Sequence, residues 1–139
     1  FGVGALVGLV HDTIISIGFI SLMGLSVDGA LIASVLTLIG YTINDKIVVF
    51  DRIRENGQIY GRSNFPKLVN SSINQCFSRT IITSLTTLFV CLILAVMGGS
   101  SIRDFGLVMV FGIIIGTYSS ITISSPFVVW WSKRFRSGV

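Results

Sequence analysis

The sequence predicts an all-α, polytopic membrane protein whose residues 1–139 form one bundle of four transmembrane helices. Only 12% of the residues are charged, against about 25% in a typical soluble domain, and 52% are hydrophobic. Two windows without any charge, 80–102 and 105–132, are longer than the roughly 20 apolar residues that a helix needs to cross a bilayer. These windows are also too long, and too little alternating, for the strands of a membrane β-barrel.

The first expected helix covers residues 1–24 and is interrupted by one polar pair, His11 and Asp12. These two side chains either titrate together with other ionisable groups in the membrane or simply bond to backbone and neighbours. The chain has no second histidine, which excludes a multi-histidine metal site within it. Gly4 and Gly8 have the GxxxG spacing that is typical of close helix contacts.

The second expected helix, 29–51, contains an acid and a base, Asp45 and Lys46. Asp45 precedes Phe50 by five residues, which places it about 7–8 Å inside the end of the span. An acid within a span costs about 2.5–3.5 kcal/mol on insertion scales, so Asp45 is either a proton-carrying carboxylate or half of a structural ion pair. Lys46 points about 100° away and is expected to extend to the cytoplasmic interface. Small and polar residues share the face of Asp45: Ser34, Thr37 or Leu38, and Tyr41.

The distribution of basic residues predicts the orientation in the membrane. The connection at 52–77, the start of the third helix and the tail at 132–139 hold eight basic residues, whereas the two short turns hold only Arg103. By the positive-inside rule the connection and the tail are cytoplasmic. This bias explains the basic pI, near 9.5, without a nucleic-acid partner. The eight residues are Arg52, Arg54, Arg62, Lys67, Arg79, Lys133, Arg134 and Arg136.

Part of the connection also reads as helical. Ser63 is a candidate N-cap, with Pro66 in the first turn that follows. Four less polar residues fall near one face of this segment: Val69, Ile73, Cys76 and Phe77. The pattern is typical of an amphipathic segment on the membrane surface, and it fits equally a plain helical extension into the cytoplasm.

The third expected helix, 78–98, begins at Arg79, where the helix macrodipole disfavours a cation. A carboxylate partner would explain this placement, and Asp45 is the natural candidate. Alternatively, Arg79 is an ordinary positive-inside residue at the interface. Hydroxyl side chains follow at helical spacing, and they serve either as a path for water or protons or as helix-packing hydrogen bonds. They are Thr80, Thr83, Ser84 and Thr87.

The fourth expected helix covers 105–131. Gly112 and Gly116 repeat the GxxxG spacing and predict tight packing against a neighbour. Trp130 and Trp131 stand directly before basic residues, as expected of an anchor at the inner interface.

Nothing in the sequence indicates an enzyme. There is no nucleotide-binding loop, no metal-ligand cluster and no nucleophile constellation. Cys76 and Cys91 lack metal-ligand spacing and are expected to be reduced thiols used as small residues.

The segment GYTINDKIVVFDRIREN, residues 40–56, resembles the signature of the SecF family of bacterial protein-export proteins. Asn44 and the pair Asp51–Arg52 favour SecF over the related SecD. Arg54 and Glu55 complete the cytoplasmic motif. Further SecF-like segments follow in matching order, including RTIITSLTTL and GGSSIRDFGLVMVFGIIIGTYSSI, so the resemblance covers nearly the whole chain.

The resemblance implies an RND-type fold, with this chain as the C-terminal membrane domain of a longer, six-helix protein. It implies a place in the bacterial cytoplasmic (inner) membrane, with SecD, the SecYEG channel and the preprotein as partners. It also implies use of the proton motive force, with protons as coupling ions and no other cofactor. The family's membrane carboxylate corresponds to Asp45 and its basic partner to Arg79, whereas Lys46 replaces the usual Thr or Ser. A passive assembly scaffold and an RND-type small-molecule transporter half are the alternatives.

Overall fold

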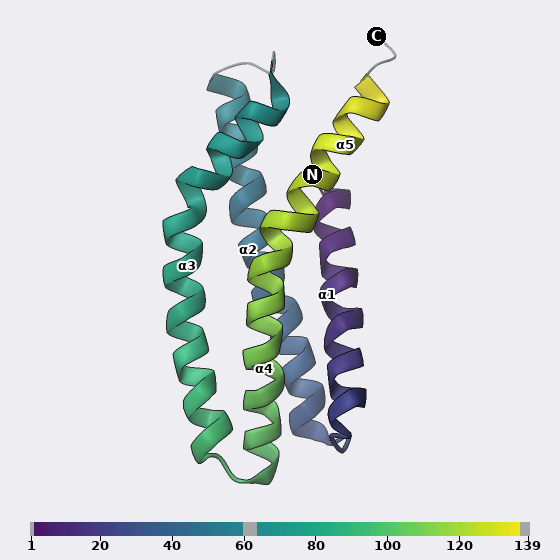
Figure 1. The fold of residues 1–139 in the computed structure, drawn as a ribbon, viewed down its shortest axis with the longest axis vertical. Helices are drawn as coiled ribbons and strands as arrows, with labels where there is room; N and C mark the ends of the chain where they lie inside the picture. The colour runs from purple at the N-terminus through teal and green to yellow at the C-terminus, as the bar shows by residue number, and fades with distance from the viewer. Residues whose placement is uncertain (1, 60–63, 137–139) are drawn as a thin grey trace.

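The described part of the structure, a computed structural model, comprises residues 2–59 and 64–136 and contains helices but no strand. Four helical segments within it are long and apolar enough to cross a membrane, which confirms the expected fold class (Figure 1). The elements are α1 (Gly2–Met23), α2 (Gly29–Ile59), α3 (Phe65–Met97), α4 (Ser100–Ser119), the π-helical turn η1 (Ser120–Ser124) and α5 (Ser125–Arg136).

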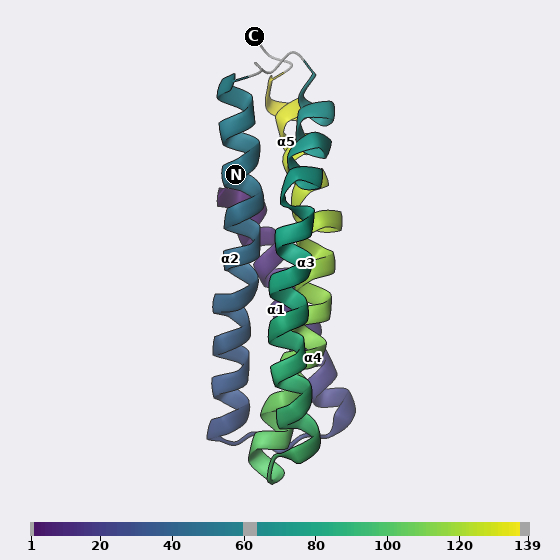
Figure 2. The same cartoon turned by 90° about the vertical axis from the view of Figure 1, so that its left-hand side faces the viewer.

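The helices run antiparallel, with α1 and α3 at the outer sides of the bundle and α4 in contact with α1, α2 and α3 (Figures 1 and 2). Both tight turns lie at one end of the bundle. In the first, Gly24 has φ +63°, a left-handed conformation that glycine adopts without a Cβ penalty. Asp28 then caps α2, because its Oδ1 accepts a hydrogen bond of 2.8 Å from the Leu31 N–H.

Helices α2 and α3 both continue beyond the expected spans. Helix α2 runs on from residue 51 to Ile59, and α3 begins at Phe65 as one continuous helix, as in a plain helical extension. Asn64 is its N-cap, with Oδ1 accepting from the Lys67 N–H at 3.4 Å. Ser63, the expected cap, and Arg62 lie outside the described residues.

Side-chain contacts hold these two extensions together. Asn56 Nδ2 donates to Ser72 Oγ at 2.8 Å, and Arg52 Nε donates to Gln75 Oε1 at 2.8 Å. Below these bonds lies an apolar cluster whose buried members include Phe50, Ile53, Val69 and Cys76. The paired extensions therefore bury a shared face, which gives each a reason to remain helical.

The fourth span is not one uninterrupted α-helix, as 105–131 had been expected to be. Helix α4 starts at Ser100, and the π turn η1 separates it from α5. Pro126 lacks the N–H that would bond to the carbonyl of Thr122, and its ring crowds that carbonyl. Within the same turn the Ser125 hydroxyl donates to the Ser120 carbonyl, at 3.0 Å. After this turn α5 leaves the bundle at an angle to α4 (Figure 1).

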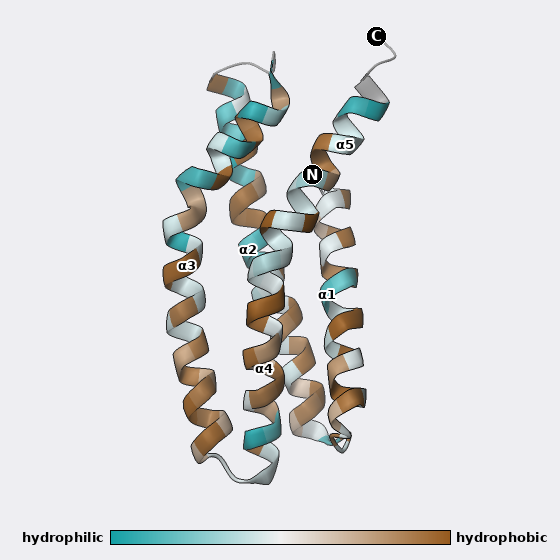
Figure 3. Ribbon diagram, in the orientation of Figure 1, coloured by the Kyte–Doolittle hydropathy of each residue, from teal (hydrophilic) through white to brown (hydrophobic). Residues whose placement is uncertain are grey.

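Apolar residues predominate along the middle of the bundle, and most of the hydrophilic residues lie toward the end opposite the tight turns (Figure 3). Large apolar side chains such as Leu22, Phe89 and Val96 are exposed. Inside, glycine allows close approach: a Cβ on Gly106 would lie 2.6 Å from the backbone nitrogen of Ala95 on α3. This combination of an apolar exterior and small residues between helices is typical of a bundle that packs in lipid.

Candidate membrane charge site

The most deeply buried charges in the described residues are Asp12 on α1 and Lys46 on α2. Lys46 Nζ lies 2.5 Å from Asp12 Oδ2, and the two side chains are 0% and 2% exposed. The expectation that Lys46 extends to the interface is therefore wrong. Its stem points into the bundle because a carboxylate on the neighbouring helix compensates its charge there.

Two glycines give this ion pair its space. A Cβ on Gly8 would lie 2.5 Å from Lys46 Cε and would overlap Ser124 Oγ. A Cβ on Gly116 would overlap Thr42 Cγ2 and would stand 3.8 Å from Asp12 Oδ2. The GxxxG residues of two different helices thus border the same buried site.

His11 extends the site toward the surface of the bundle. Its Nδ1 lies 3.1 Å from Asp12 Oδ1, so each oxygen of this carboxylate has its own partner. The His11 side chain is 34% exposed, and it is the least buried of the three. Ser16 Oγ donates to the Asp12 carbonyl at 2.7 Å, which fixes the backbone below the pair.

Asp45 lies beside this pair in sequence but does not join it. The residue is 6% exposed, and its Oδ2 has no hydrogen-bond partner in the part of the chain that the structure describes. The expected ion pair with Arg79 is absent from the salt bridges of these residues, and Arg79 is exposed.

The hydroxyl residues of α3 divide into two sets. Thr83 Oγ1 donates to the Arg79 carbonyl at 2.9 Å, and Thr87 Oγ1 donates to the Thr83 carbonyl at 2.9 Å. Ser84 instead lies at the centre of the bundle, 2.8 Å from Thr117 Oγ1 and 3.5 Å from the hydroxyl of Tyr41. Backbone bonding therefore accounts for Thr83 and Thr87, while Ser84 joins three helices.

The sequence reasoning missed Ser124, the last residue of the π turn. Ser124 and Ser119, which ends α4, are buried, and their hydroxyls have no hydrogen-bond partner among the described residues. Ser124 stands at Gly8, beside the Lys46 stem. The sequence did carry one signal, the run of hydroxyl residues before Pro126. The π turn that forms there is an element that is frequent at functional sites.

The cytoplasmic motif lies away from the buried charges. Arg52 Nη1 pairs with Glu55 Oε2 at 2.6 Å on the exposed end of α2. Asp51 and Arg54 are exposed, and Asn44 is also exposed, on the outer face of α2. No group of three or more potential metal ligands occurs within the described ranges.

Comparisons with known proteins match this architecture. The family model described as "Protein export membrane protein SecD/SecF, C-terminal" matches residues 1–134. The protein translocase subunit SecF of Rickettsia akari (strain Hartford) is 48% identical over 134 residues, covering 96% of this chain and 44% of the relative. SecF of Rickettsia bellii (strain OSU 85-389) is 48% identical over 136 residues, covering 97% and 45%.

Two solved structures are also similar. A crystal structure of SecDF in the super-membrane-facing form superposes with a TM-score of 0.93 at 49% identity, covering 99% of this chain and 19% of that one. The crystal structure of SecDF from Thermus thermophilus, described as a translocon-associated membrane protein, gives 0.91 at 50% identity, covering 96% and 18%. This chain therefore spans less than half the length of the relatives that it matches.

Proposed function

Since this chain belongs to the SecD/SecF family of protein export membrane proteins, we propose that it forms the C-terminal membrane part of a SecF subunit. In this proposal the subunit works with SecD beside the SecYEG channel in the bacterial inner membrane. It uses the proton motive force to assist preprotein translocation, and it acts as a proton-coupled translocase subunit rather than an enzyme. The long connection and the C-terminus face the cytoplasm.

The observation that carries the proposal is the buried carboxylate oxygen of Asp45, which has no hydrogen-bond partner among the described residues. A carboxylate within a span normally has a partner or water, because its charge is costly in hydrocarbon. Taking up a proton removes that charge, and releasing the proton restores it. Among the ionisable groups of this site, Asp45 is thus the one whose local interactions change most when it binds a proton.

The Asp12–Lys46 ion pair supports this assignment. With Nζ held at Asp12, the nearest cation in sequence does not neutralise Asp45 directly. The pair also ties α1 to α2 at the same depth. A proton arriving at Asp45 would then alter its relation to Arg79 and to α3 while α1 and α2 stay joined.

The energy available is sufficient for such a step. Moving one charge through 100 mV supplies about 2.3 kcal/mol. This changes the ratio of two conformations roughly 50-fold. A bundle whose two arrangements are nearly balanced would therefore respond to each proton that passes.

A partner for the outer face of α2 is part of the proposal. Asn44 is exposed on α2 at membrane depth, whereas the exposed Thr37 on the same helix donates its hydroxyl to the Ala33 carbonyl. Polar side chains inside a membrane normally face protein or water rather than lipid. This supports SecD helices as the cover for that surface.

The test is Asp45→Asn in the full-length SecF–SecD complex, with Asp104→Asn as the control, because Asp104 lies in the first turns of α4, outside the charge site and the 51–55 motif. Preprotein translocation into inner-membrane vesicles is measured with and without a proton gradient. The proposal expects D45N to abolish the gradient-dependent part while D104N retains it and both variants assemble with SecD. Full gradient-dependent translocation by D45N would contradict the proposal.

The same assays separate the alternatives. A passive scaffold predicts that D45N impairs assembly with SecD and leaves the response of assembled complexes to the gradient unchanged. A small-molecule transporter half predicts that D45N abolishes proton-driven movement of a small molecule while preprotein translocation continues.

A further inference from the structure

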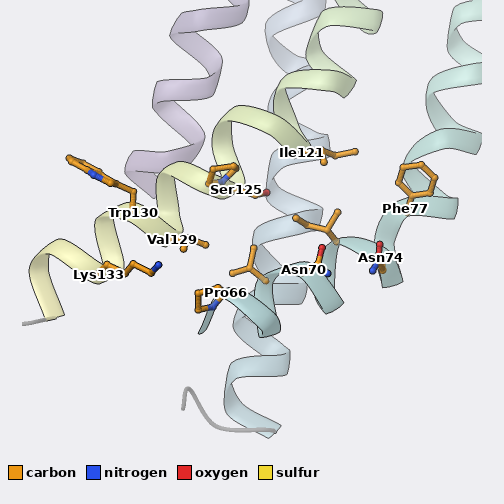
Figure 4. Close-up of a pocket in the computed structure, with 12 residues that line it drawn as sticks. Pro66, Asn70, Asn74, Phe77, Ile121, Ser125, Val129, Trp130 and Lys133 are labelled. Atoms are coloured by element: carbon orange, nitrogen blue, oxygen red, sulfur yellow. The ribbon is translucent and has the colours of Figure 1, made fainter. Parts of the chain in front are cut away.

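A groove of about 580 Å³ lies between the first turns of α3 and the segment formed by η1 and α5 (Figure 4). Such a volume is in the range of small-molecule sites. The side chains that line it are Pro66, Val69, Asn70, Ile73, Asn74, Phe77, Ile121, Ser125, Pro126, Val129, Trp130 and Lys133.

The groove has a cation at one end and two large apolar side chains at the other, with Asn74 beside Phe77. Lys133 and Pro66 lie toward the C-terminal end of α5, whereas Phe77 and Ile121 lie at the opposite end (Figure 4). From Pro66 to Phe77 the groove follows α3 for eleven residues, which is about 16 Å at 1.5 Å per residue. A ligand that fills it must itself change from polar to apolar over that length.

The polar side chains that line the groove are one cation, Lys133, two neutral amides, Asn70 and Asn74, and one serine. No acidic side chain lines the groove. The Lys133 ammonium and the Asn70 and Asn74 carboxamides have no hydrogen-bond or ion-pair partner within residues 2–59 and 64–134. Ser125 does have one, because its hydroxyl donates to the Ser120 carbonyl. A Lys133 ammonium with no acid beside it in the groove favours an anion such as a phosphate diester.

The rim places the Lys133 end of the groove at the headgroup level of a bilayer. Trp130 is half-exposed and stands beside Lys133, the arrangement of an interfacial aromatic belt. Phe77 is likewise half-exposed at the deeper end. Basic pockets between transmembrane helices on the cytoplasmic side are a recurrent form of lipid site.

We propose that this groove binds one anionic phospholipid of the cytoplasmic leaflet. The phosphate lies at Lys133, and an acyl chain follows the groove past Ile73 and Asn74 to Phe77, into the hydrocarbon. An apolar partner helix fits less well, because it would bury the Lys133 charge without an acid to pair with it. The site does not depend on proton coupling at Asp45.

The test uses the purified full-length SecF–SecD complex in detergent, titrated with dioleoylphosphatidylglycerol or dioleoylphosphatidylcholine and monitored by native mass spectrometry. The phosphatidylglycerol is expected to bind at least five-fold more tightly. Lys133→Gln removes one cation near the headgroup and should weaken phosphatidylglycerol binding roughly five-fold. Lys67→Gln is the matched control, because Lys67 is an exposed cation on α3 that does not line the groove.

A second variant tests the apolar part without touching the core. Asn74→Trp places a large ring in the groove and should weaken binding of both lipids, whereas thermal unfolding should stay within the wild-type range. Equal affinity for the two lipids, equal effects of K133Q and K67Q, or full competition by inorganic phosphate would overturn the proposal. So would cross-linking of an Asn74→Cys variant to SecD in place of lipid, because that result assigns the groove to a protein partner.

Discussion

Replacing Lys46 with methionine tests the buried ion pair most directly. Methionine keeps an unbranched stem of similar length, which the space beside Gly8 accepts, but it removes the charge. Asp12 then remains buried at 2% exposure, and the His11 imidazole is the side chain left beside its carboxylate. Removing one partner of a buried pair leaves an uncompensated charge, and the usual cost is about 3–5 kcal/mol.

The double variant, K46M with Asp12→Asn, separates the ion pair from simple packing. Because both charges are then gone, stability should return to within about 1–2 kcal/mol of the wild type. The free energy of unfolding is measured for the full-length protein by SDS titration in mixed micelles. Lys67→Met serves as the control, since Lys67 is exposed and has no ion pair in the described residues.

The result that refutes the reasoning is additivity. If K46M and D12N each cost little and their effects simply sum, the two groups do not interact in the folded membrane protein. If K46M and the double variant are equally unstable, the loss comes from packing of the lysine stem rather than from an unpaired carboxylate.

Two further predictions concern the helix contact beside the site and the cap of α2. Gly116→Ala places a methyl group against Thr42 and should lower the free energy of unfolding by about 1–3 kcal/mol, whereas Gly40→Ala, which meets nothing within 4 Å, should be neutral or slightly stabilising in the same SDS titration. Hydrogen bonding from the Leu31 N–H lowers the pKa of the Asp28 carboxyl below its usual 3.8. The Asp28 carboxylate therefore stabilises the folded protein fully above pH 3.8, and this stabilisation is lost as the pH falls through the lower pKa of the folded state. Asp28→Asn should remove that part of the decline in thermal unfolding temperature between pH 5 and pH 3, and an unchanged decline would contradict the cap assignment.

Much of the fold follows from short-range features of the sequence. Lipid cannot satisfy backbone N–H and C=O groups, so a long charge-free segment must form a helix whatever its neighbours are. The positions of the spans, the tight turn at Gly24 and the use of small residues such as Gly112 between helices are visible for this reason. The continuation of α2 from residue 51 to Ile59 was not, because hydrogen bonds to α3, such as the one from Asn56 to Ser72 16 residues later, stabilise it.

The candidate site was only partly predictable. Asp45, Asp12 and His11 stood out because ionisable groups are rare in spans. Their partners did not, since nothing local couples Lys46 to a residue 34 positions earlier. The absence of an Asp45–Arg79 ion pair likewise depends on how α3 is rotated relative to α2, and hydropathy does not specify that rotation.

The sequence alone predicts that this protein is an all-α membrane bundle with charged residues inside two of its spans. Composition decides this, because each segment must satisfy its own backbone and match the apolar medium around it. Only the tertiary structure decided that Lys46 belongs to Asp12, that Asp45 keeps an unpartnered oxygen, and that a π turn brings Ser124 to the same place. Those pairings depend on the depth and rotation of whole helices, which many weak contacts along their full length determine together.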